Sequence, residues 1–96
     1  MPPVSRTPEW MPRISEFFGI VISMYWDDHG EPHFHAEYAE FGASIAIGTL
    51  EVLDGRLPRR KLAEVRAWAA LHKAELIVNW ERARAKRPLN RIAPLV

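Results

Sequence analysis

The spacing of apolar residues changes once along this chain of 96 residues, close to Pro58. Before that point, apolar and polar residues alternate or form short β-branched and aromatic runs, which are typical of strands. After it, apolar residues recur every three to four positions as far as Ala83, as they do along one face of a helix. A run of strands followed by a run of helices predicts an α+β fold.

Four strands are expected in the first half of the chain, over residues 17–26, 33–40, 43–47 and 50–53. Glycine, proline and aspartate separate them, and residues 27–32 (DDHGEP) form the densest turn signal. Because the connections are short, consecutive strands are expected to pair as an antiparallel meander.

Residues 58–86 would extend about 44 Å as one straight helix. A compact domain of this length has a radius of gyration of only about 12–13 Å. We therefore expect two helices with a break near His72, which has the spacing of a capping box with Glu75. The expected order is ββββαα, with both helices on the apolar face of the sheet. Residues 11–96 are expected to form this single domain, and residues 1–10 a flexible N-terminal extension.

Alternation in the second strand divides its side chains between two faces. His33, His35 and Glu37 share one face, and apolar side chains share the other. A register that places apolar residues opposite each other turns the imidazoles away from the core, whereas a shift by one residue would bury them at a desolvation cost. The expected pairs are Trp26–Phe34, Tyr25–His35, Met24–Ala36 and Ser23–Glu37.

The resulting polar face predicts a candidate catalytic site. Imidazole titrates near pH 6.5, so a histidine pair beside a phenol and carboxylates can exchange protons at neutral pH. In this interpretation His33 and His35 transfer protons, and Tyr25, Asp27 and Glu37 support them.

Two other interpretations of that face remain open. An H-x-H pair on a strand points two imidazoles the same way, about 6.5–7 Å apart along the chain. His33 and His35 could then bind a divalent metal ion, with Glu37, Asp27 or His29 as a further ligand. The other interpretation is a solvated strand face whose polar groups bond only to nearby loops. No other cofactor is expected.

Charge is divided sharply along the chain. Residues 1–55 carry two Lys and Arg against nine Asp and Glu, a net charge of −7, and residues 56–96 carry eleven against three, a net charge of +8. A basic half can attract phosphate backbones or an acidic partner, although an acidic sheet beside a basic helical layer gives the same division. The candidate contacts for RNA or a partner protein lie beyond the apolar stripe, at Arg82, Arg84, Lys86 and Arg87.

Composition excludes several classes of protein. The chain has no cysteine, which excludes a disulfide framework, a thiolate zinc site and a cysteine nucleophile. No apolar run approaches the ~20 residues of a membrane span, and the N-terminus lacks the apolar segment of a secretory signal. A cytoplasmic location without a membrane partner is therefore expected.

Two motifs resemble a known family. The D-H-x-x-P-H-F-H segment at Asp28–His35 and the L-P…W…H…E-L…N-W series over Leu57–Trp80 are similar to the small bacterial family called domain of unknown function 4160. The resemblance extends over about Met11 to Leu95. It brings no established activity.

What the resemblance implies is mainly a genetic context. Genes of this family often lie beside those of another small family, in an arrangement similar to toxin–antitoxin pairs. This implies a small cytoplasmic bacterial protein with a small cognate protein partner from a neighbouring gene, and a toxin directed at RNA. The alternative is a non-catalytic module that binds a protein or a nucleic acid.

Overall fold

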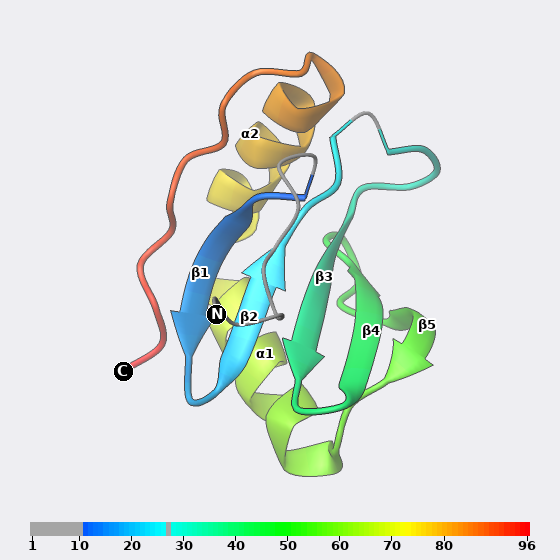
Figure 1. Ribbon diagram of the computed structural model, residues 1–96, viewed down its shortest axis with the longest axis vertical. Coiled ribbons are helices and arrows are strands. Elements are labelled where there is room, and N and C mark those ends of the chain that lie inside the picture. The colour runs from blue at the N-terminus through cyan, green and yellow to red at the C-terminus, as the bar shows by residue number, and fades with distance from the viewer. Residues whose placement is uncertain (1–10, 27) are drawn as a thin grey trace, which may run out of the picture.

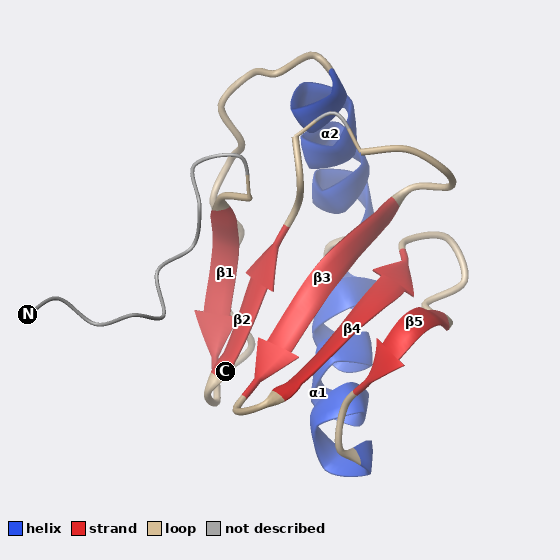
Figure 2. Cartoon of the chain, turned by 45° about the vertical axis from the view of Figure 1, so that its right-hand side comes forward, coloured by secondary structure: helices blue, strands red, loops and turns tan. Residues whose placement is uncertain are grey.

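The computed structural model describes residues 11–26 and 28–96, so the expected extension at residues 1–10 lies outside them. The elements are β1 (Arg13–Phe17), β2 (Ile20–Ser23), β3 (His33–Tyr38), β4 (Phe41–Ala46), β5 (Val52–Arg56), α1 (Arg59–Leu71) and α2 (Lys73–Arg84). The described strands form one antiparallel sheet in the order β1-β2-β3-β4-β5 (Figure 1). Figure 2 shows both helices behind this sheet. The expected α+β meander followed by two helices is confirmed.

The expectation of four strands is wrong, because β1 precedes the first expected strand, and the strand expected over residues 17–26 is reduced to β2. A two-residue turn at Phe18 and Gly19 separates β1 from β2, and both residues have positive φ, 51° and 80°. Positive φ at both central positions is the geometry of a type I′ hairpin turn, whose twist matches that of the strands. An aromatic residue rarely adopts this conformation, so Phe18 carried no turn signal.

The last strand also differs from expectation, since β5 begins at Val52 and continues through Gly55. Gly55 has a φ of 76°, and a Cβ there would lie 2.1 Å from the carbonyl oxygen of Gly42 in β4. Gly55, which lies two residues beyond the expected end of this strand, therefore permits the close approach of β5 to β4.

The register of β2 against β3 differs from the expected one by two residues. Ser23 lies opposite His35 and Ile22 lies opposite Ala36, so the four expected pairs are wrong. Because β2 ends at Ser23, Tyr25 and Trp26 belong to the following loop. A shift of two residues leaves every side chain on its original face, and the division of β3 into an apolar and a polar face is confirmed.

The core lies between the sheet and the helices. The indole of Trp68 in α1 is fully buried, and its ring centroid lies 5.3 Å from that of Phe17 and 5.9 Å from that of Phe34. The expected helix break is confirmed, because His72 separates α1 from α2 and its side chain contacts Glu75. Within the described residues, neither helix has the length and apolar composition needed to cross a membrane.

The segment after α2 is held against the rest of the molecule. The side chain of Asn79 donates to the carbonyl of Asn90 at 2.9 Å and accepts from its backbone N–H at 2.8 Å. The N–H of Ile92 donates to the carbonyl of Ile14 in β1 at 2.8 Å. The segment consequently descends beside β1 (Figure 1).

Candidate functional site

The two histidines of β3 lie on the face of the sheet opposite the buried Phe34 and Ala36. Their side chains are largely covered, with 12% of His33 and 18% of His35 exposed. Side chains that alternate along a strand point to opposite faces, so the packing of Phe34 beneath Trp68 determines where both imidazoles point.

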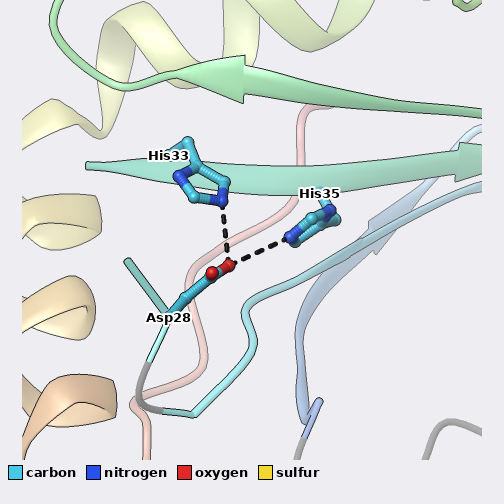
Figure 3. Close-up of side chains that lie close together, drawn as sticks. All are labelled: Asp28, His33 and His35. Carbon is cyan, nitrogen blue, oxygen red and sulfur yellow. Dashed lines mark ion pairs between the residues drawn. The ribbon is translucent and has the colours of Figure 1, made fainter. Parts of the chain in front are cut away.

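Asp28 reaches both imidazoles from the loop between β2 and β3 (Figure 3). Its Oδ2 atom lies 2.9 Å from Nε2 of His33 and 3.6 Å from Nε2 of His35. Its Oδ1 atom accepts a hydrogen bond of 2.8 Å from the backbone N–H of His29, which fixes the orientation of the carboxylate. We call Asp28, His33 and His35 the Asp–His–His cluster.

The hydrogen bond of Nδ1 shows which ring nitrogen of His33 carries a proton. Nδ1 of His33 lies 2.8 Å from the carbonyl oxygen of Glu31. A carbonyl oxygen only accepts, so Nδ1 must donate and carries a proton. In the neutral ring the lone pair is therefore on Nε2, which points at Asp28.

His35 has one satisfied and one unsatisfied nitrogen. Its Nδ1 atom forms a hydrogen bond of 3.2 Å with the hydroxyl of Ser44, which lies opposite it on β4. Its Nε2 atom is buried and has no hydrogen-bond partner among the described residues, since 3.6 Å to Asp28 exceeds hydrogen-bond distance. A buried polar atom without a partner is uncommon in folded proteins.

Burial sets the protonation state of His35. Desolvation and the neighbouring His33 lower the pKa of His35 below 6.5, and the attraction of Asp28 offsets them only in part. The ring is consequently neutral at pH 7 and offers a lone pair.

Asp28 remains a carboxylate under the same conditions. Burial alone would raise its pKa, but the hydrogen bond from the N–H of His29 and the nearby imidazoles of His33 and His35 outweigh it, so the pKa of Asp28 lies below 3.8.

Aromatic contacts hold the imidazoles in place. The indole of Trp80 in α2 packs on His33 at 5.1 Å between ring centroids, the two imidazoles lie 5.2 Å apart edge to face, and the phenol ring of Tyr25 lies 4.2 Å from His35. Side chains whose rotamers are fixed by packing form preorganised sites.

A hollow of about 330 Å³ opens beside His35. Its polar lining comes from Tyr25, Glu37, Ser44 and Asp54, together with His35 itself. The cluster therefore borders a space that can admit a ligand.

Comparison with known proteins places the chain in a family. A sequence model described as Domain of unknown function (DUF4160) matches residues 19–81, which is more than half of the chain. The chain belongs to the DUF4160 family. Nothing among curated proteins or solved structures matches it significantly.

The matched part of this DUF4160 chain contains the whole Asp–His–His cluster. Of the sequence-predicted site residues, the structure brings together His33, His35 and Tyr25, and it places Glu37 in the wall of the hollow. Asp27 lies outside the described residues. His29 is exposed, and among the described residues its contact with the cluster is made by its backbone N–H.

Two site residues of the DUF4160 chain were not expected from its sequence. Asp28 indicates only a turn in the sequence, although it opens the D-H-x-x-P-H-F-H motif. A prediction of the register between β3 and β4 would have identified Ser44, because that register places it opposite His35.

The predicted basic contacts lie at and beyond the end of α2, immediately after the matched residues. Nε of Arg82 donates to the carbonyl of Pro88 at 2.6 Å, so this side chain holds the C-terminal segment. Arg84, Lys86 and Arg87 are exposed.

The donor set of the cluster allows two kinds of chemistry. A neutral imidazole beside a carboxylate can accept and return a proton. Imidazole nitrogens and a carboxylate oxygen are also the ligands of many transition-metal sites in proteins.

Proposed function

We propose that this DUF4160 protein acts on RNA through the Asp–His–His cluster and the adjoining hollow, as the cytoplasmic toxin component of a toxin–antitoxin-like pair. The observation that carries the proposal is the neutral, rigidly packed imidazole of His35 at the wall of an open hollow. A preorganised imidazole that is neutral at pH 7 can accept a proton in catalysis.

RNA is a suitable substrate for such a site. Its 2′-hydroxyl is a nucleophile next to the phosphodiester bond, so cleavage requires removal of that proton and supply of one to the leaving oxygen. The exposed cations Arg84, Lys86 and Arg87 would contact phosphates.

The catalytic part of the proposal is tested with RNA cleavage and growth inhibition, the latter with and without the neighbouring gene. His33→Ala and His35→Ala should each lower cleavage by about 10²-fold or more, the usual contribution of a general acid or base. His29→Ala is the matched control, since its imidazole is exposed and outside the cluster. Undiminished cleavage in both cluster variants, with folding verified by circular dichroism, would overturn the proposal.

The basic segment is tested separately by binding. The double variant Arg84→Gln, Arg87→Gln should weaken RNA binding and flatten its dependence on salt, by about 0.7 in the log–log slope for each phosphate that the variant no longer neutralises. Arg82 is left unchanged because it holds the C-terminal segment. An unaltered salt slope would reject phosphate binding by this segment.

A second candidate function is non-catalytic binding of the cognate partner protein. It is favoured by the carboxylates of Glu37 and Asp54 in the lining of the hollow, which suit a lysine or arginine side chain of a partner. Under this alternative, Glu37→Gln with Asp54→Asn weakens the complex with the neighbouring gene product, and the histidine variants leave growth unchanged.

A further inference from the structure

We infer that Asp28, His33 and His35 together bind one divalent transition-metal ion of the Zn²⁺ type. This deepens the proposed function by naming the cofactor of the same site, although the binding itself requires no RNA. One ligand atom from each residue lies within 4.8 Å of the other two.

The two distances from Asp28 to the imidazoles are close to those between ligands of one metal ion. With metal–ligand bonds of about 2.0–2.2 Å, neighbouring ligand atoms lie about 2.9 Å apart at 90° and about 3.4 Å apart at the tetrahedral angle. Oδ2 of Asp28 lies 2.9 Å and 3.6 Å from the two Nε2 atoms. Movements of a few tenths of an ångström in Asp28 would therefore bring both carboxylate–imidazole distances to those expected between two ligands of one ion.

The outer contacts of the histidines are those of metal ligands. A histidine that binds a metal through one nitrogen usually donates its other N–H to a carbonyl, carboxylate or water, which fixes the ring. His33 donates Nδ1–H to the carbonyl of Glu31, and Nδ1 of His35 bonds to the hydroxyl of Ser44. Both Nε2 atoms are thereby directed at the same side of Asp28 (Figure 3).

Two features of the cluster suit a cation bound between its three side chains. In its neutral form His33 holds a lone pair 2.9 Å from a carboxylate oxygen of Asp28, and two lone pairs repel at that distance. The buried Nε2 of His35 has no hydrogen-bond partner among the described residues. A proton between His33 and Asp28 relieves the first problem, whereas one divalent ion relieves both.

The ligand types select the class of ion. Ca²⁺ and Mg²⁺ prefer sites made of oxygen ligands, whereas two imidazoles and a carboxylate suit Zn²⁺ and its first-row neighbours. Three protein ligands leave at least one coordination position for water or substrate, which distinguishes catalytic from structural zinc sites.

A divalent ion also makes the hollow compatible with RNA. Glu37 and Asp54 line that space and repel phosphate. Of the three ligands only His35 lines the hollow, so an ion bound by the cluster lies beside this space, where its two positive charges attract a phosphodiester oxygen. The acidic character of this face, which opposes the binding of RNA in the metal-free protein, is then offset by the cofactor.

The test is a titration of the full chain, purified without a histidine tag and stripped with a chelator. Calorimetry with ZnCl₂ should give one ion per chain, and MgCl₂ should bind far more weakly. His33→Ala, His35→Ala and the isosteric Asp28→Asn should each lower Zn²⁺ affinity at least tenfold. His29→Ala, a change of the same kind in the same loop, should leave the affinity unchanged. Saturating Zn²⁺ should raise the melting temperature of the wild type and of His29→Ala only.

Several results would overturn the inference. They are the absence of Zn²⁺ binding to the wild type, undiminished affinity in a folded Asp28→Asn variant, and an equal loss in His29→Ala. Zn²⁺ binding without any cleavage of RNA would support the metal centre but reject the proposed function. Cleavage that persists after chelation would support the RNA-directed function and reject metal as its cofactor.

Discussion

The two faces of β3 meet opposite requirements with alternate residues of the same six-residue strand. On the covered face, Phe34 and Ala36 are fully buried and contact other apolar side chains. On the other face, His33 and His35 are held by directional contacts to a carbonyl, a hydroxyl, a carboxylate and aromatic rings. The first face contributes stability through area removed from water. The second uses buried polar atoms to fix the positions of its side chains.

The same contrast appears between two buried polar side chains. Asn79, on the helical side, is fully buried and both ends of its amide are bonded to the backbone of Asn90. His35 has Nε2 buried without such a partner within the described part of the chain. A purely structural polar group resembles Asn79, because an unsatisfied buried group costs about 1–3 kcal/mol. Buried side-chain oxygens of Ser15, Ser23 and Glu64 also lack a hydrogen-bond partner among the described residues. His35 differs from them in that its unpartnered atom lies beside a carboxylate and a second imidazole, those of Asp28 and His33.

Truncation on the covered face should have the largest effect. Phe34→Ala removes a fully buried ring that packs edge to face on Trp68. The free energy of unfolding should fall by about 3–5 kcal/mol, measured by urea denaturation. Phe18→Ala is the matched control, since half of that ring is exposed, and should cost about 1 kcal/mol or less. Equal losses in the two variants would contradict the assignment of the core.

Removal of the satisfied amide should have an intermediate effect. Asn79→Ala leaves both backbone groups of Asn90 without their partner, and unfolding should become easier by about 2 kcal/mol. The released C-terminal segment should also be cleaved faster by a protease. Asn90→Ala tests the interpretation, because these bonds use only the backbone of Asn90 and should survive. A comparable loss in Asn90→Ala would show that the amide of Asn79 is not what holds the segment.

The sequence predicted the two faces but not the pairs across them. The face on which a side chain lies depends only on whether its position in the strand is odd or even, and the alternation of residues 33–38 (HFHAEY) shows this directly. The register depends on where β2 begins, and that depends on the positive φ of Phe18, for which the sequence carries no signal. The contact between Asp28 and the imidazoles depends in turn on how a loop folds back over the sheet. Local patterns therefore predicted the histidines of the site and missed its carboxylate.

The smallest expected effect is on the pH dependence of the stability of the metal-free protein. Because the folded state lowers the pKa of His35, the unfolded chain binds a proton more readily below about pH 6.5. Its contribution to stability is therefore full above the unfolded pKa and is lost as pH falls from about 6.5 through the folded pKa. The lowered pKa of Asp28 acts in the same direction, but only below about 3.8.

Between pH 7.5 and 5.5, the chelator-treated wild type should therefore lose more stability than His35→Gln, in urea denaturation at both pH values. Glutamine keeps a polar side chain in place but cannot take up a proton. His29→Gln should behave like the wild type, since that imidazole is exposed. If wild type and His35→Gln lost the same amount, the ring would not be held neutral by its surroundings. The face of β3 that carries the histidines would then tolerate a charged imidazole, as a solvated strand does. It would differ from the face that carries Phe34 only in the polarity of its side chains.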